Sequence, residues 1–387
     1  MSGFQMSCRS ILLCLLAMAV YAGRPATSNA AEGPADRGRI VSTRAVATVA
    51  DRTSFSDLAV FNGRLFLTFL DLPDDDSQEA YIRVMGSKDG ASWTTVDKIR
   101  QSEPGRELLH GKKAGRLVRY VTPQFSVVNG QRLSILARDR RQGSTFAESD
   151  HRAVKWSSVD GKMWKYDGRN DLGAYCGRPV WDKDAGYCYE FGTGCGSAST
   201  IQIWRTTDGQ NYGKHFRHTF RDMPRDASLF FADGKAYCLL ARCGFSARYR
   251  LVDGVPELVE QSPTGKSTFE PAILGSATFP YLDWEWKELG QTIFSPNVIH
   301  VPDMGTFAAV EIKTSPNRTS LCRLDLKAGS LTELVRLGDL RQEQIGPSAR
   351  LPEGEKHMPI GLAAHDGHFW VSYAEKNAVK VIKIALE

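Results

Sequence analysis

Long apolar runs are almost missing from this chain of 387 residues. The one such run covers residues 11–20, follows Arg9, and is succeeded by small residues that end at Ala31. A positive charge, a short apolar core and then small residues are typical of a secretory signal peptide. The run is shorter than the roughly 20 residues that a membrane-spanning helix needs. We therefore expect residues 1–31 to be a signal peptide, and the mature protein to be periplasmic or secreted, without membrane insertion.

A bias toward one sign of charge is also missing. The net charge is +5, and the 49 Lys and Arg residues are scattered among 44 Asp and Glu residues. A nucleic-acid-binding protein would cluster its basic residues, so we expect no nucleic acid partner. No interior segment is rich enough in Pro, Gly and Ser to link two domains. We therefore expect residues 32–387 to form a single domain, and the protein to be a monomer.

Metal-binding spacings of cysteine and histidine are absent as well. Zinc sites match one close pair of cysteines with a second pair or with histidines, and this chain has no such match. No cofactor motif is present either, so we expect no metal and no cofactor. An even number of cysteines in an oxidising compartment permits three disulfides, and buried thiols are the alternative. The cysteines beyond the signal peptide are Cys176, Cys188, Cys195, Cys238, Cys243 and Cys322.

Long helical periodicity is missing throughout, and a tight turn followed by an apolar strand recurs in its place. Each turn supplies the positive φ that a hairpin needs, and each following run is rich in strand-forming residues. The intervals between turns are long enough for four short strands plus loops, as in the blade of a propeller. The sequence therefore predicts an all-β, six-bladed β-propeller. The six turns start at Asn62, Asn129, Asp184, Asp233, Asp303 and Asp366.

The strand-like segment Arg39–Val49 precedes the first predicted blade. We expect this segment to pair with the last blade and to close the ring, because pairing removes an exposed edge. The segment Val379–Leu386 is expected to be an inner or neighbouring strand of the same blade.

A second repeat reads hydroxyl residue, any residue, Asp-Gly, two residues, aromatic residue. It occurs at Ser87–Trp93, Ser158–Trp164 and Thr206–Tyr212. The Asp can accept backbone N–H bonds within the turn, the Gly takes the strained conformation, and the aromatic residue packs under the hairpin. The three copies resemble degenerate Asp boxes, the characteristic turns of sialidases and related propellers. We interpret them as structural, because they lie on outer hairpins.

The second half of the chain resembles a group of bacterial secreted proteins of the exo-α-sialidase-like type, within the sialidase (neuraminidase) superfamily. The stretch Asp283–Gly290 is the most specific part of this resemblance. The other matching segments are residues 280–282, 296–299, 318–322, 361–367 and 370–373.

The resemblance implies a known set of catalytic groups. Three arginines clamp the carboxylate of the sugar, because a guanidinium fork fits a carboxylate bidentately. A tyrosine acts as nucleophile with help from a glutamate, and an aspartate protonates the leaving group. The resemblance implies that these groups come from different blades and project toward the axis.

Four residues match this set. Asp226 is the candidate catalytic acid, and Arg242 follows it at the expected spacing within one blade. Arg318 matches the third arginine, and Arg178 matches an arginine beside an apolar strand. For the three arginines, the alternative is a structural role between blades, paired with a carboxylate. Asp226 has an alternative too, because it can simply pair with Arg225 or Arg242.

Other positions depart from the family pattern. Met358-Pro359 stands where the resemblance implies Ser-Tyr, and proline has no hydroxyl with which to attack an anomeric carbon. In the first blade, Asp71 and residues 74–76 could supply an acid, and Arg52 lies near the expected first clamp arginine.

The sequence thus supports a secreted sialidase-like propeller that acts on or recognises a glycan or glycoconjugate, as an exo-α-sialidase if it is active. The alternative is a non-catalytic propeller that binds glycan or protein. Another propeller chemistry, such as lyase or oxidoreductase work, has no motif in its support. Trp284 and Trp286 alternate along an extended segment, where they either stack on a sugar or pack between blades.

Overall fold

Every regular element that the structure describes is a β-strand. The structure is a computed structural model, and it describes part of the chain. The described residues are 37–48, 52–72, 81–100, 120–139, 152–170, 175–176, 178–182, 187–193, 200–209, 211–220, 223–243, 247–252, 255–261, 269–314, 317–338, 360–375 and 378–387.

The first two sheets are four-stranded antiparallel meanders in which consecutive strands are neighbours. The first contains β2 (Arg52–Phe61), β3 (Arg64–Leu72), β4 (Tyr81–Ser87) and β5 (Thr94–Arg100). The second contains β6 (Tyr120–Val128), β7 (Arg132–Asp139), β8 (Arg152–Ser158) and β9 (Lys165–Asn170).

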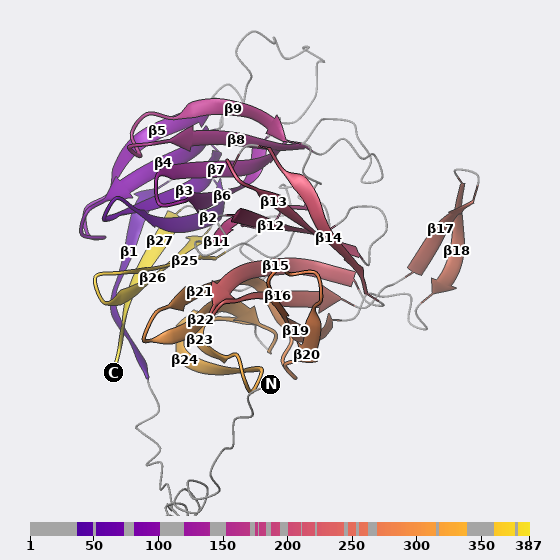
Figure 1. The fold of residues 1–387 in the computed structure, drawn as a ribbon. Helices are drawn as coiled ribbons and strands as arrows, with labels where there is room; N and C mark the ends of the chain where they lie inside the picture. Colours follow the sequence, from indigo (N-terminus) through magenta and orange to yellow (C-terminus); the bar gives the residue numbers. More distant parts are fainter. Residues whose placement is uncertain are drawn as a thin grey trace, which may run out of the picture. The chain divides into compact units, whose positions relative to one another are not determined.

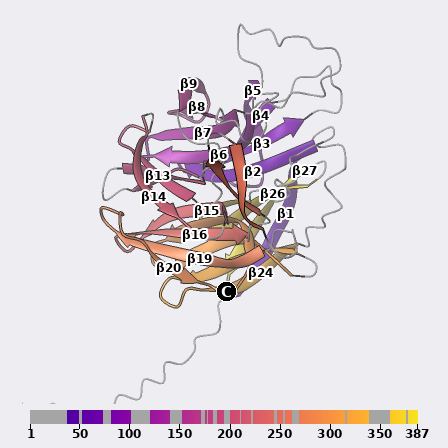
Figure 2. The same ribbon diagram turned by 90° about the vertical axis from the view of Figure 1, so that its right-hand side faces the viewer.

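The third sheet is built differently, because it has five strands and its first part is divided. Both β10 (Tyr175–Cys176) and β11 (Val180–Asp182) pair with β12 (Tyr187–Thr193), which is followed by β13 (Thr200–Thr206) and β14 (Gly213–Thr219). Two views place β13 and β14 between the second sheet and β15 (Figures 1 and 2).

Two further meanders follow. One contains β15 (Met223–Ala232), β16 (Lys235–Cys243), β19 (Phe269–Thr278) and β20 (Glu285–Glu288). The next contains β21 (Ile293–Val301), β22 (Gly305–Ile312), β23 (Arg318–Asp325) and β24 (Ser330–Gly338). Between β16 and β19, a separate hairpin of β17 (Ala247–Val252) and β18 (Val255–Gln261) forms a two-stranded sheet, which Figure 1 shows to one side of the others.

The last sheet joins both ends of the described chain. It contains β25 (Gly361–His365), β26 (His368–Glu375) and β27 (Ala378–Leu386), and β1 (Gly38–Thr48) pairs with β27. The pairing of the N-terminal strand with this sheet was expected from the sequence. The fold is thus an all-β propeller. Six blades were predicted, but among the described strands only five sheets have the four strands of a regular propeller blade.

The predicted tight turns have the predicted backbone conformation wherever the structure describes them. Asn62, Asn129, Asp233, Asp303 and Asp366 all have positive φ, between 48° and 65°. Asn and Asp tolerate this left-handed region better than most residues, which is why they start hairpin turns. The one remaining predicted turn, at residues 184–186, lies outside the described residues.

The three Asp-Gly turns contain the hydrogen bonds that the sequence predicts. Asp89 Oδ1 accepts bonds from the N–H groups of Ala91 at 2.8 Å and Ser92 at 2.9 Å. The turns at Asp160 and Asp208 repeat the pattern. Gly90 also lies against another sheet, since a Cβ at this position would be 2.0 Å from the ring of Trp370 on β26. These turns therefore tie one sheet to its neighbour as well as closing a hairpin.

The core lies between neighbouring sheets. One cluster joins the first two sheets and includes Phe66 and Phe125, both almost fully buried. Another joins the first and last sheets through Leu65 and Trp370. Two β-sheets that pack face to face in this way remove large apolar areas from water, which is the main favourable term in folding.

Two of the six cysteines follow the second of the two alternatives predicted for these residues, the buried thiol. Cys238 and Cys322 are free, buried thiols, so three disulfides among the six cysteines do not form in this structure. Burial raises the pKa of Cys238 and raises that of Cys322 to about 12, which keeps both thiols protonated. The side chains of Cys176, Cys188 and Cys243, and all of Cys195, lie outside the described part.

The propeller has two unlike ends. Strand direction alternates within each sheet, so first-to-second and third-to-fourth connections emerge at one end, which we call the turn end. These connections are short. The longest of them are residues 88–93, 159–164, 207–212 and 279–284. The other connections, at what we call the loop end, include the much longer stretches 101–119, 140–151, 244–268 and 339–360. Long connections between strands are more often functional than tight turns are.

Candidate functional site

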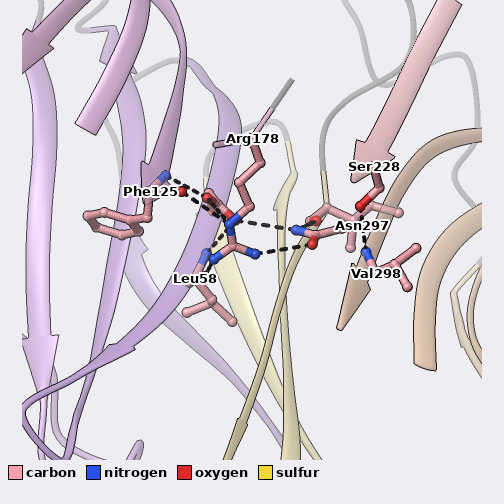
Figure 3. A network of polar contacts seen from close by, with 8 residues as sticks. Leu58, Phe125, Arg178, Ser228, Asn297 and Val298 are labelled. Atoms are coloured by element: carbon pink, nitrogen blue, oxygen red, sulfur yellow. Dashed lines mark hydrogen bonds and ion pairs between the residues drawn. The ribbon is translucent and has the colours of Figure 1, made fainter. Parts of the chain in front are cut away.

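The innermost strands of several sheets meet around Arg178, which lies two residues before β11 (Figure 3). Its Nε donates to Phe125 O at 3.1 Å, one terminal nitrogen donates to Asn297 Oδ1 at 3.2 Å, and the other donates to Leu58 O at 2.6 Å. The Nε also lies 3.7 Å from Asp57 Oδ2. All three guanidinium nitrogens of Arg178 are thus engaged by the protein, on the first strands of three other sheets.

Asp57 on β2 is the buried acid of this network, with 3% of its surface exposed. Its Oδ1 accepts from Leu58 N at 2.9 Å, and its Oδ2 accepts from Phe125 N at 2.7 Å. Burial raises the pKa of Asp57 above the ordinary value, and the charge of Arg178 and these backbone donors act in the opposite direction. A buried carboxylate is tolerated only with such partners.

Asn297 on β21 completes the connection. Its Nδ2 donates to Ile360 O at 2.8 Å and approaches Asp57 Oδ1 at 3.4 Å, while its Oδ1 accepts from Arg178. Asn297 thus connects β21 to Asp57 on β2 and to Ile360, which directly precedes β25.

A repeated β-bulge aims these side chains. The register shifts between Ser54 and Asp57 on β2, and between Phe294 and Asn297 on β21. In the same bulges, Phe55 and Ser295 have positive φ, of 56° and 46°. A bulge re-aims the side chain that follows it, which places Asp57 and Asn297 in the centre.

Sequence reasoning missed Asp57 and Asn297. Each is a polar residue directly before a largely apolar run that leads to a predicted hairpin turn, at Asn62 or Asp303. That shared position before the turn was a usable signal.

Asp226, the predicted acid, lies on β15 at the loop end and is partly buried. Its Oδ2 accepts from Ser295 N at 3.2 Å, across to the first strand of the next sheet. Two residues on, Ser228 Oγ accepts from Val298 N at 2.9 Å (Figure 3). Asp226 and Arg178 therefore both bind the same segment of β21, at Ser295 and at Asn297.

Arg242 lies at the loop end of β16, in register with Glu270 on β19. Its Nε donates to Pro271 O at 2.8 Å, and one terminal nitrogen lies 2.8 Å from Glu288 Oε2 on β20. The guanidinium of Arg242 thus reaches the outermost strand of its own sheet.

Arg318, at the loop end of β23, has an equivalent arrangement. A terminal nitrogen lies 2.6 Å from Glu333 Oε2 on β24, and the other oxygen of Glu333 accepts from Ser320 Oγ at 2.8 Å. Each of these two arginines has a glutamate partner on an outer strand. The described contacts bring Arg178 and Asp226 together through β21, and they do not bring Arg242 and Arg318 into that group.

An aromatic group lies at the junction of the fourth and fifth sheets counted along the chain, where Phe294 directly precedes Ser295, the residue that bonds to Asp226. Phe269 at the start of β19 meets Phe294 edge-on, with ring centroids 4.8 Å apart. The ammonium of Lys313 lies 4.3 Å from the Phe269 ring centroid. Half-buried aromatic rings are suited to contact with the apolar faces of sugars. The sequence analysis did not single out Phe269 or Lys313, since neither belongs to a motif.

The remaining predicted candidates add little to this group. Asp71 is paired with Arg83 within its own sheet. The side chain of Arg52, residues 74–76 and Met358-Pro359 lie outside the described part of the chain, as does the side chain of Arg225.

A buried tyrosine–carboxylate pair exists at the turn end. Tyr281 Oη donates to Asp182 Oδ2 at 2.8 Å, and both residues are almost fully buried. Asp182 ends β11 at the turn end, and the pair has little exposed surface, so its role is to join the third and fourth sheets.

Trp284 and Trp286 pack between sheets. The two rings stack on one another with centroids 5.5 Å apart, and Trp286 stacks on His218 of β14 at 5.9 Å. A Cβ at Gly275 would lie 2.5 Å from the Trp286 ring, so that ring rests on the backbone of β19. Of the two interpretations of these residues, packing between blades fits these contacts. Burial lowers the pKa of His218, which favours the neutral ring in this aromatic layer.

Neither a metal-binding cluster nor a membrane-spanning helix is found among the described residues. They contain no group of three or more His, Cys, Asp or Glu side chains arranged to hold a metal ion. They also contain no helix of sufficient length and apolar character to cross a bilayer.

No protein family model matches this chain, and no curated protein matches it by sequence. Solved structures do match the fold. A protein of unknown function from Dyadobacter fermentans has a TM-score of 0.63 at 12% identity, covering 90% of this chain and 99% of that one. The Penicillium chrysogenum α-L-arabinanase complexed with arabinobiose gives 0.56 at 16% identity, with 91% and 98% covered.

A third match is a mutant of Trypanosoma rangeli sialidase that displays trans-sialidase activity. Its TM-score is 0.54 at 9% identity, and the match covers 91% of this chain but 59% of that chain. At such identities, the similarity shows the fold alone. This chain therefore has the propeller fold that is also found in glycoside hydrolases.

Proposed function

We propose that this protein is a secreted, sialidase-like propeller that acts on or recognises glycans at its loop end. In this proposal the third sheet counts as one of six blades, β1 closes the ring, and the three Asp-Gly turns are degenerate Asp boxes. Residues 1–31 are a signal peptide, and the mature protein is a monomer.

One observation carries the proposal. The predicted site residues Arg178, Asp226, Arg242 and Arg318 all lie where strands begin or end at the loop end. A propeller offers a ligand the end where long connections surround the axis, because tight turns leave little room for specific contacts. Phe269 adds an aromatic surface at the junction of the same two sheets that Asp226 and Ser295 connect, which suits a ligand with an apolar sugar face.

The chemistry available at this place centres on Asp226. Its carboxyl group is positioned by a single backbone N–H group and is partly buried, so it can bind a sugar hydroxyl or donate a proton to a leaving oxygen. Arg242 and Arg318 contribute positive charge at the loop end. Each forms an ion pair with a glutamate on an outer strand, Glu288 or Glu333. An acidic sugar that binds there replaces one carboxylate partner with another.

The test is a panel of glycans and chromogenic glycosides offered to purified protein. The panel includes sialyllactose, an aryl sialoside, arabinobiose and an aryl α-L-arabinofuranoside. We expect binding or turnover of at least one of them, and a loss of about tenfold or more on Asp226→Asn, because one charged hydrogen-bonding group is removed.

A matched control is Asp233→Asn, at the turn end of the hairpin formed by β15 and β16, where Asn also accepts the positive φ of 49°. This variant should behave as the wild type does. Binding without turnover identifies a recognition protein, and turnover identifies the enzyme. A silent panel, or equal losses in both variants, contradicts the proposal.

A further inference from the structure

Arg178 has contacts that suit a different task from ligand binding. Its guanidinium group bonds to Phe125 O on β6, Leu58 O on β2 and Asn297 Oδ1 on β21. These acceptors lie 53, 120 and 119 residues away along the chain. A rigid planar fork that holds three separated strands fixes their relative positions, and a lysine with a single nitrogen cannot reproduce this.

The connection to Asp226 runs through a short segment of β21. Asn297 is held by Arg178 on one side, and Ser295, two residues earlier, donates its N–H to Asp226 Oδ2 at 3.2 Å. Ser295 has a positive φ of 46°, which is unfavourable for a residue with a side chain. Such a conformation persists only when the surroundings impose it. The contacts of Asn297 supply that constraint.

We propose that Arg178 is a positioning residue, which acts through Asn297 and Ser295 to hold Asp226 in place for the ligand. Arg178 itself does not touch the ligand. The part of this inference that concerns ligand binding rests on the function proposed above, whereas the mechanical connection does not.

Buried charge explains why this connection is strong. The partner of Arg178, Asp57, is almost fully buried and also approaches Asn297 Nδ2 at 3.4 Å. Removing the guanidinium would leave an uncompensated carboxylate inside the protein. The side chains of Arg178, Asp57 and Asn297 are therefore held in a fixed position relative to one another. Ile360 O accepts the second bond of Asn297, which extends the constraint to the last sheet.

Hydrogen exchange tests the mechanical connection. The amide groups of Ser295 and Val298 both donate to side chains of β15, so their protection reports on the contact between β15 and β21. We expect Arg178→Lys and Asn297→Ala each to lower the protection of peptides covering residues 293–300 by about tenfold or more. Arg64→Lys and Asn211→Ala, both at the turn end, are the matched controls and should leave it unchanged.

Ligand binding tests the positioning role with sialyllactose as the probe. We expect Asn297→Ala to weaken binding about tenfold, and Asp226→Asn to cause little further loss in that background, because both changes disable one unit. Additive losses would overturn the positioning role. Unchanged exchange in both Arg178→Lys and Asn297→Ala would overturn the connection itself. If the wild type binds no sialyllactose while exchange rises as expected, the connection stands and the sialoside version of the proposed function fails.

Discussion

The turn end and the loop end of the propeller are stabilised by different kinds of contact. At the turn end, Asp89 bonds to N–H groups two and three residues further along the chain. At the loop end, Asp57 bonds to Phe125, 68 residues away, and Asn297 approaches Asp57 from 240 residues away. The turn end is specified largely by short stretches of sequence, with some contacts between sheets such as that of Tyr281 with Asp182, whereas the network at the loop end forms only when several sheets have assembled. The proposed ligand site lies at the assembled end.

The largest effect should come from breaking the assembled end. Arg178→Met should lower the free energy of unfolding by about 3–5 kcal/mol, because it leaves the buried Asp57 carboxylate without its charge partner. Chemical denaturation monitored by tryptophan fluorescence measures this. Lys98→Met, which removes an exposed cation above the Tyr81 ring, should cost less than about 1 kcal/mol. Equal losses of unfolding free energy in the two variants would show that the contacts around Arg178 stabilise the protein no more than an exposed surface contact does.

The next effect concerns the place where a local turn meets another sheet. Gly90→Ala should cost about 3 kcal/mol, because the added Cβ meets the Trp370 ring at 2.0 Å and φ is +67°. Gly63→Ala has a similar φ of +64° and nothing within 4 Å, so it should cost only about 1 kcal/mol. Thermal unfolding of the two variants separates packing from backbone strain. A loss at Gly90 that does not exceed the loss at Gly63 contradicts this assignment.

A smaller effect is expected from the buried pair at the turn end. Tyr281→Phe removes the hydroxyl that donates to Asp182, and we expect a loss of about 1–3 kcal/mol in denaturant unfolding. Tyr166→Phe is the control, because Tyr166 is 44% exposed. If Tyr281→Phe matches this control, the hydrogen bond from Tyr281 to Asp182 contributes nothing to stability.

The smallest effect is a dependence on pH within the local turns. Backbone N–H groups lower the pKa of Asp89 and Asp160 below the ordinary 3.8. Their contribution is therefore complete above pH 3.8 and is lost as the pH falls through the lower folded value. Asp89→Asn should narrow the difference in stability between pH 7 and about pH 3. Denaturation midpoints are measured for the variant and the wild type across this pH range. If both midpoints change by the same amount with pH, the prediction for Asp89 is wrong.

The same contrast explains how much the sequence could predict. The turns at Asn62 and Asn129, and the bonds of Asp89, follow from neighbouring residues, so reading the sequence found them. Strand pairing of β1 with the last sheet was also predicted, because an unpaired strand needs a partner. The divided third sheet and the hairpin of β17 and β18 were not predicted, since they interrupt the repeat.

The site was predicted less completely for a related reason. Arg178 and Asp226 were chosen by resemblance, and the structure links them through β21. Asp57 and Asn297 were missed because their importance depends on residues more than a hundred positions away. No spacing rule in one sequence reports such a contact. The glutamate partners of Arg242 and Arg318 were not predicted either, because each pair depends on which strands lie near one another in the sheet.

The pairing of β1 with β27 also bears on how this chain could be rearranged. Gly38 stands opposite Leu386, and Glu387 N donates to Arg37 O at 2.9 Å, so positions 37 and 387 are adjacent. A short linker between them would barely disturb the sheet, and new termini could be opened in the exposed Asn129-Gly130 turn. Circularly permuted forms of this protein should therefore fold, and they would allow a reporter to be attached at a chosen sheet.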